Sequence, residues 1–132
     1  MGLDMNLYVS GEEDLKDVIS AVENLDGYID DVIYWRKANS IHGFFVREVQ
    51  AGKDDCGFYE VSRATLECLL SLCETALETR DGSLLPPTGG FFFGSTEVDD
   101  WYWHDIEGTR DSLIEILRDN DDKSRFWYSS SW

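Results

Sequence analysis

The chain has 132 residues, of which 42% are hydrophobic and 14% aromatic, and its formal net charge is −16. A chain of this length forms one domain and carries enough apolar residues for a core. The strong negative charge argues against free nucleic acid or an anionic membrane surface as a direct partner, but it is compatible with a basic protein patch.

The cysteines and the first residues of the chain indicate the cellular compartment. Cys56, Cys68 and Cys73 are odd in number and form no CxxC pair, which favours reduced thiols over a disulfide framework. The opening "MGLDMNLYV" lacks the basic start and the long apolar run of a signal peptide. No apolar run is long enough to span a bilayer. We therefore expect a cytoplasmic protein with no membrane partner.

The first quarter of the chain predicts a strand, a helix and a second strand. Residues 3–9 alternate weakly between apolar and polar side chains, which is typical of a strand. Ser10 resembles an N-cap because acids follow it in the first helical turn, and the Asp26-Gly27 pair would end this helix. The apolar residues at 32–35 predict the second strand.

The middle of the chain predicts a helix, a short strand and a second helix. "KANSIHGFFVREVQAG" has apolar residues at helical spacing, and "GFYEVS" is typical of a short strand in which Phe58 and Val61 are buried. Ser62 is the expected N-cap of the next helix, which "RDG" would stop. The predicted inward residues are Ala38, Ile41, Phe45 and Val49 in the first helix, and Leu66, Leu69, Leu70, Cys73, Ala76 and Leu77 in the second.

The last third predicts a long loop, a helix and a final strand, "RFWYSSSW". Thr96 and Asp99 resemble a capping box for a helix that runs to about Asp119 and that Gly108 could interrupt. The expected fold is a single α+β domain over residues 1–132, with a small, mainly antiparallel or mixed sheet of about four strands covered by about four helices, mainly on one face. The expected inward residues of the last helix are Trp101, Ile106, Leu113, Ile116 and Leu117.

The first candidate binding segment is "YWRKANSIH", which crosses from a strand end into a helix N-terminus. Trp35 offers a stacking face, and Arg36 and Lys37 lie where backbone N–H groups favour anions. Asn39 and His42 add adaptable hydrogen bonds. These residues suit a small anionic ligand such as a nucleotide. The alternative interpretation is structural: a core tryptophan, an ion-paired arginine and a half-exposed histidine.

The second candidate is the loop "GGFFFGST", in which three phenylalanines stand between glycines. Gly94, Ser95 and Thr96 can present N–H and hydroxyl donors to an anion. In an extended segment, Phe92 points away from the side that its two neighbours share, so we expect at least one accessible ring. Phe92 and Trp101 complete the predicted ligand-binding set. Packing of the phenylalanines into the core is the alternative.

Two further constellations have weaker support. Cys56 could act as a nucleophile with His42 as base and Asp55 as its orienting group. His42, Cys56 and His104 are metal-ligand residue types, but they have no recognised spacing. We therefore predict no metal, no cofactor and no assigned catalytic residue.

Six segments occur in order along most of the chain: "MGLDM", "YWRKANSIHGFFV", "DDCGFYEVSRATLECL", "LLPPTGGFFFGSTE", "DDWYWHDI" and "YSSSW". Together they resemble a family of small, uncharacterised proteins encoded by bacteriophages and prophages. Gly43 and "PPTGG" depart from the family pattern. The resemblance implies a phage accessory protein in the cytoplasm of the infected bacterium, but it brings no assigned chemistry.

Three functional hypotheses follow. The leading one is a counter-defence protein that binds or sequesters a small anionic, nucleotide-like ligand without turnover, by analogy with other small phage accessory proteins. A homo-oligomer could share such a site. The first alternative is an acidic decoy that imitates the phosphate rows of DNA and occupies a basic host defence protein. The second is a small hydrolase that uses Cys56 and His42.

Overall fold

A computed structural model describes residues 2–11, 16–17, 19–20, 30–90 and 93–132. Its centre is a four-stranded antiparallel sheet in the order β2-β1-β4-β3. One sheet with helices packed against it is an α+β fold, which confirms the predicted fold class. The strands are β1 (Asp4–Ser10), β2 (Asp30–Arg36), β3 (Tyr59–Val61) and β4 (Arg125–Ser131).

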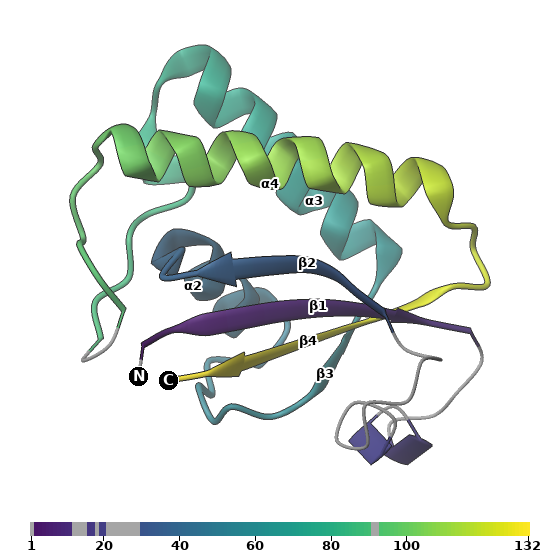
Figure 1. Ribbon diagram of the computed structural model, residues 1–132. Coiled ribbons are helices and arrows are strands. Elements are labelled where there is room, and N and C mark those ends of the chain that lie inside the picture. Colours follow the sequence, from purple (N-terminus) through teal and green to yellow (C-terminus); the bar gives the residue numbers. More distant parts are fainter. Residues whose placement is uncertain (1, 12–15, 18, 21–29, 91–92) are drawn as a thin grey trace.

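The first and last strands of the sequence pair with each other in the middle of the sheet. Leu7 of β1 lies opposite Tyr128 of β4 on one side and Ile33 of β2 on the other. Because side chains alternate along a strand, this register places the apolar residues of all three strands on one face. The two ends of the chain consequently lie side by side (Figure 1).

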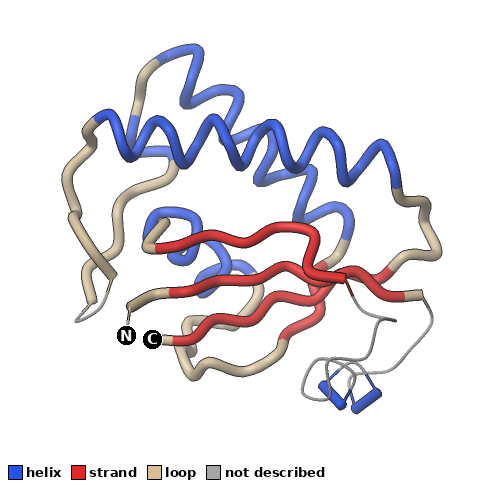
Figure 2. Tube along the Cα trace, viewed as in Figure 1, coloured by secondary structure: helices blue, strands red, loops and turns tan. Residues whose placement is uncertain are grey.

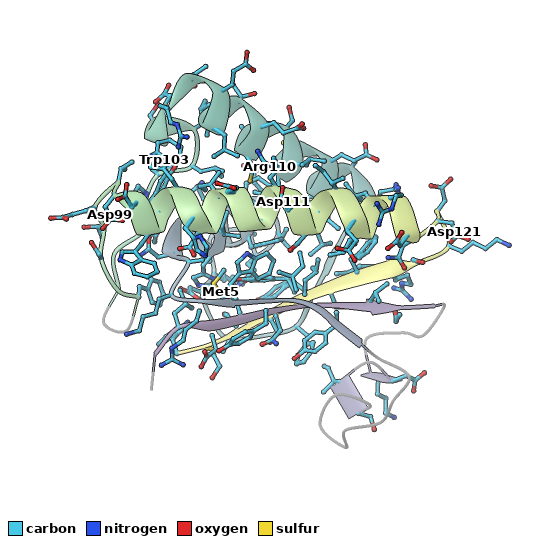
Figure 3. All side chains as sticks on the ribbon, turned by 45° about the horizontal axis from the view of Figure 1, so that its top comes forward. Met5, Asp99, Trp103, Arg110, Asp111 and Asp121 are labelled. Carbon is cyan, nitrogen blue, oxygen red and sulfur yellow. The ribbon has the colours of Figure 1, made fainter. Side chains whose placement is uncertain are left out.

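The helices cover that apolar face (Figure 2). The helices over this face are α2 (Asn39–Glu48), α3 (Arg63–Thr79) and α4 (Asp100–Asp119), with a short 3-10 helix, η1 (Gly82–Leu84), after α3. In Figure 3, Met5 of β1 lies beneath α4, whereas Arg110 and Asp111 lie on the outer side of that helix. The ring of Phe45 in α2 stacks on Tyr128 of β4 with 4.0 Å between the ring centroids.

The predicted apolar stripes of α2 and α3 and the predicted N-cap of α3 are confirmed. Ala38, Ile41 and Phe45 are buried and Val49 packs against the core. The Ser62 side chain accepts a hydrogen bond from the Thr65 N–H at 3.1 Å, which satisfies one of the unpaired donors at the start of α3. The predicted stripe of α3 is buried or partly buried throughout: Leu66, Leu69, Leu70, Cys73, Ala76 and Leu77.

The prediction for the start of the last helix is wrong by one turn. Asp99, not Thr96, caps α4, because its carboxylate accepts the Tyr102 N–H at 3.0 Å. Trp101, predicted to face inward, is 76% exposed, and the adjacent Tyr102 is buried in its place. Gly108 does not interrupt the helix.

The buried stripe of α4 explains this difference, because its residues recur every three or four positions and Trp101 is out of phase with them. Leu117, the last residue predicted to be inward, is partly buried. The stripe comprises Tyr102, Ile106, Thr109, Leu113 and Ile116.

The predicted helix after Ser10 lies mostly outside the described residues. Ser10 itself is the last residue of β1, and its hydroxyl accepts a hydrogen bond from the Trp127 indole at 2.8 Å. This hydrogen bond joins the two central strands, whereas the N–H groups that Ser10 is predicted to cap lie outside the described residues.

Two tryptophans provide a matched stability test. Trp35 is only 6% exposed, and its indole N–H donates to the Thr109 hydroxyl at 2.8 Å. We expect Trp35→Ala to lower the free energy of unfolding by about 3–5 kcal/mol, because it leaves a cavity and removes the hydrogen bond to Thr109. Trp101→Ala should change it by less than about 0.5 kcal/mol, as for an exposed side chain. Urea denaturation measures both, and equal losses would place Trp101 in the core.

Candidate functional site

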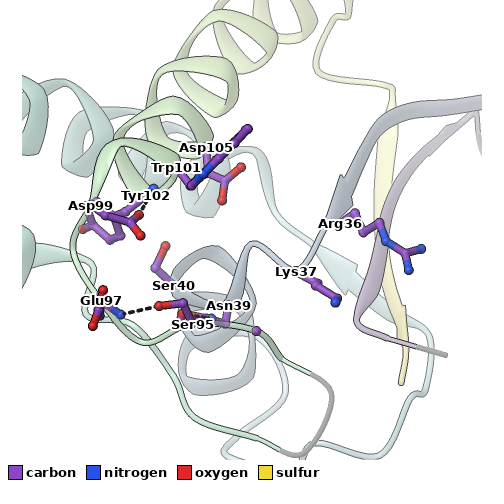
Figure 4. Close-up of a pocket in the computed structure, with 11 residues that line it drawn as sticks. Arg36, Lys37, Asn39, Ser40, Ser95, Glu97, Asp99, Trp101, Tyr102 and Asp105 are labelled. Carbon is purple, nitrogen blue, oxygen red and sulfur yellow. Dashed lines mark hydrogen bonds between the residues drawn. The ribbon is translucent and has the colours of Figure 1, made fainter.

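A pocket of about 310 Å³ opens between the end of β2, the start of α2, the loop after residue 93 and the first turns of α4. Figure 4 shows the side chains around it. The pocket brings together both candidate segments of the sequence. It is lined by Arg36, Lys37, Asn39, Ser40, Gly94, Ser95, Glu97, Asp99, Trp101, Tyr102 and Asp105.

Three of the predicted ligand-binding residues that the structure describes do not line this pocket. Trp35 is part of the hydrophobic core, and His42 is completely buried. Thr96 is exposed beside the pocket without forming its wall. Phe92 lies outside the described residues, so the prediction of an accessible ring there stays a prediction. Phe93 is 6% exposed and belongs to the core.

Asn39 holds the loop that forms one wall of the pocket. Its amide nitrogen donates to the carbonyl oxygens of Phe93 at 2.9 Å and Ser95 at 2.8 Å. Its amide oxygen accepts the Thr88 N–H at 3.0 Å. Both donor hydrogens and one acceptor position of this buried side chain are thereby used within the protein. The predicted ligand-binding residue is thus the residue that positions the wall.

Gly43, one turn further along α2, allows the same loop to approach closely. A Cβ at this position would lie 2.2 Å from the Thr88 hydroxyl oxygen and 3.1 Å from an Arg47 guanidinium nitrogen. Only a residue without a side chain leaves this space open. The sequence signal was a glycine inside a helical pattern, which marks close backbone approach when it is not a helix end.

Substitutions at two helical glycines can distinguish the effect of close packing from the effect of helix propensity. A Cβ at Gly108 of α4 would meet nothing within 4 Å. We expect Gly108→Ala to raise the free energy of unfolding by about 0.5–1 kcal/mol through helix propensity. Gly43→Ala should lower it by about 1–3 kcal/mol because the loop must move.

Thermal unfolding of the two variants measures this contrast. In a Thr88→Ala background, part of the Gly43→Ala loss should be recovered, because the nearest atom is gone. Stabilisation by Gly43→Ala in the unmodified protein would contradict the contact.

His42 lies in a buried hydrogen-bonded chain below the loop. Its Nδ1 is 2.6 Å from the Tyr128 hydroxyl, and its Nε2 is 3.0 Å from each carboxylate oxygen of Asp54. A proton on Nε2, with the Tyr128 hydroxyl donating to Nδ1, satisfies both ring nitrogens. Burial holds the pKa of Tyr128 well above its ordinary value. Phe93 packs edge-on against the imidazole, at 5.2 Å between ring centroids.

These contacts bear on the thiol chemistry that the sequence raised. Both nitrogens of His42 are hydrogen-bonded to residues other than Cys56. The Asp55 carboxylate accepts the Tyr59 hydroxyl, at 2.8 and 2.7 Å from its two oxygens, and the Gly57 N–H at 3.0 Å. Cys56 is exposed. The three residues therefore do not form a nucleophile–base–orienter chain.

Arg36 and Lys37 form the cationic end of the pocket. Lys37 has a positive φ of 56°, and its N–H donates to the Leu3 carbonyl at 2.7 Å, so the chain turns sharply from β2 into α2. Ala38 gives α2 no side-chain cap, and the first turn contains no acid. Arg36 pairs with Asp4 at 3.2 Å while its side chain stays 54% exposed. An uncapped helix start beside two bases favours an anionic group.

Three acids that sequence reasoning missed form the opposite end. Glu97, Asp99 and Asp105 line the side of the pocket opposite Lys37 and Arg36, whose side chains point away from these acids in Figure 4. The search for an anion site gave no weight to acids, although the sequence "EVDDWYWHD" contains all three next to an exposed tryptophan. The pocket therefore has three acids against two bases, which does not match a ligand that is anionic throughout.

Asp105 is the acid with the most perturbed ionisation. Burial raises its pKa from the usual 3.8 to about 6, with nearby His104 opposing the shift and Asp99 adding to it. An acid kept in a pocket at a cost in its charged state is typical of functional sites.

Asp105 predicts a specific pH dependence of stability. The folded protein binds more protons than the unfolded chain between about pH 4 and 6, so this group's contribution falls as pH rises through that window. Asp105→Asn removes the ionised carboxyl. We expect the variant to be more stable than wild type by about 1–2 kcal/mol at pH 7.5 and equally stable near pH 4. Parallel pH–stability curves for the two proteins would contradict the raised pKa.

The comparisons with known proteins give no information about this pocket. No protein-family model, no curated protein and no solved structure matches the chain. Within the described ranges, no three His, Cys, Asp or Glu side chains are grouped as a metal site. None of the helices in the described part of the chain is both long and apolar enough to cross a membrane.

Proposed function

We propose that the protein binds a small nucleotide-like ligand in this pocket without chemical turnover. The observation that carries the proposal is the two-ended lining, with Arg36 and Lys37 on one side, Asp99 and Asp105 on the other, and Trp101 between solvent and the acidic end. A nucleotide has matching parts: an anionic phosphate, a flat base and hydrogen-bond donors on the base edge.

The phosphate would lie at the cationic end. Lys37 and Arg36 supply positive charge there, and α2 begins beside the same space without a side-chain cap or an acid in its first turn. Gly94 has a φ of 84°, which favours glycine, and a Cβ built on it would lie at van der Waals distance, 3.4 Å, from Lys37 Cβ, so the loop runs beside this lysine. The loop backbone and the lysine thus border one subsite.

The base would stack on Trp101. This side chain is 76% exposed although it is a large aromatic group, and it borders the pocket. Stacking of a base on an aromatic ring contributes about 1–3 kcal/mol. The pocket volume of about 310 Å³ is at the lower end of the range for small-molecule sites, about 300–1,000 Å³, which favours a mononucleotide over a larger ligand.

The biological setting rests on the resemblance to phage and prophage proteins. In that setting, the protein would act in the cytoplasm of the infected bacterium and lower the free concentration of a nucleotide used by host defence. Binding without turnover is sufficient for such a role. The absence of a nucleophile–base chain at Cys56 and His42 supports binding over hydrolysis.

The acidic decoy stays the second candidate because of one feature of α4. Glu107, Asp111, Glu115 and Asp119 are exposed and recur every four residues, about 6 Å apart along the helix. However, Arg110 and Arg118 pair with Asp111 and Asp119, which neutralises half of the row. The row is therefore a weaker imitation of a phosphate backbone than its spacing suggests.

The proposal is tested by calorimetry with the four common nucleoside 5′-monophosphates, together with mass spectrometry of small molecules released from the denatured protein. We expect at least one mononucleotide to bind, and Lys37→Ala and Trp101→Ala each to weaken it about tenfold. Lys123→Ala is the matched control, because Lys123 is an exposed base outside the pocket.

Two outcomes would count against the proposal. If no mononucleotide binds or is released, the ligand-binding function fails. If the protein instead binds a basic protein with steep salt dependence that is lost on neutralising Glu107 and Glu115, the decoy takes its place.

A further inference from the structure

We propose that the acidic end of the pocket selects a base edge with two adjacent N–H donors, the edge that guanine presents, and that the Asp105 carboxylate accepts both. This inference rests on the proposed nucleotide binding and deepens it. It concerns which base is bound, and it assigns the selection to one residue.

The relative position of Trp101 and Asp105 supports this assignment. They are four residues apart in α4, so they lie on the same side of the helix, one turn and about 6 Å apart along its axis. Figure 4 shows both above the pocket, with the Asp105 carboxyl turned toward the space beside Lys37. A base lying on the indole would have its edge toward this carboxyl.

Asp105 is the acid whose carboxylate is available to accept hydrogen bonds from a ligand. The Asp99 carboxylate already accepts the Tyr102 N–H as the cap of α4. Within the described part of the chain, no donor is hydrogen-bonded to the Asp105 carboxylate. Its partial burial makes ionisation costly, and two N–H donors from a ligand would relieve that cost.

The chemistry of the bases then decides the selectivity. An ionised carboxylate only accepts hydrogen bonds, and its two oxygens can accept two parallel N–H groups. Guanine offers N1–H and the 2-amino group side by side. Adenine and cytosine place an acceptor nitrogen next to their single amino group, and this acceptor would face a carboxylate oxygen. Hypoxanthine keeps N1–H but lacks the second donor.

The proposal also implies a pH dependence of binding. The groups facing Asp105 are Asp99 and His104 on its own helix, Glu97 from the loop, and Lys37 and Arg36 from the junction of β2 with α2. With a carboxyl pKa of about 6 in the free protein, the accepting form is lost on acidification. Affinity for the guanine nucleotide should therefore fall as the pH drops below about 6.

The experiment is calorimetry with GMP, IMP, AMP and XMP on wild type and Asp105→Asn at pH 7.5. In wild type we expect GMP to bind about 10- to 100-fold more tightly than AMP, with IMP in between. A carboxamide keeps one acceptor and replaces the other by a donor. Because xanthine replaces the 2-amino group by an oxygen, Asp105→Asn should lose the preference for GMP and gain XMP binding. Asp100→Asn is the matched control, since Asp100 is exposed on the same helix outside the pocket.

The outcomes separate this inference from the proposed function. If AMP binds wild type as tightly as GMP does, or if Asp105→Asn still prefers GMP, the assignment of base selection to Asp105 is overturned while nucleotide binding stands. If no mononucleotide binds, both fall. The pH arm compares GMP binding to wild type and Asp105→Asn between pH 5 and 8, so that titration of the phosphate, which also occurs near pH 6, cancels. Identical pH profiles would also overturn the assignment.

Discussion

The three hydrogen bonds of the Asn39 amide are the interaction on which the pocket depends. They join the start of α2 to both ends of the segment between Thr88 and Ser95, residues far away in the sequence. A loop of glycines and phenylalanines has little reason of its own to adopt one course, because glycine costs much conformational entropy to fix. The buried amide supplies that reason, and the space left by Gly43 lets the loop lie directly on the helix.

A second constraint is electrostatic, and it opposes the fold rather than supporting it. The chain carries a net charge of −16, yet three of its carboxylates are gathered around one pocket, and one of these is half-buried. Side chains kept at a cost in stability are concentrated where ligands bind. Arg36 and Lys37 give the opposite end of the pocket a local field of the other sign. The pocket is therefore directional, and the proposed ligand would fit it in one orientation.

Local sequence patterns predicted the helices and strands well where a residue's role depends on residues close to it in the sequence. Ser62 as a cap, the stripe from Leu66 to Leu77, and the alternation in β1 are all of this kind. The same patterns failed where a distant partner decides the role. Asn39 and His42 look like ligand-binding side chains, but contacts with residues up to 86 positions away use their polar atoms inside the protein. The prediction that Trp101 faces inward was wrong for another reason. A shift of one residue in helical phase moves a side chain from the core to the solvent.

The pairing of β1 with β4 has a consequence for how the molecule is made. Asp4 lies opposite Ser131, so the central ladder of the sheet joins the earliest and the latest strands to leave the ribosome. Until β4 has been synthesised, β1 has one vacant edge, and the apolar face under α4 lacks one of its central strands. Such long-range closure slows folding and makes it cooperative. A nascent chain would thus lack the complete sheet that supports the pocket until β4 has left the ribosome.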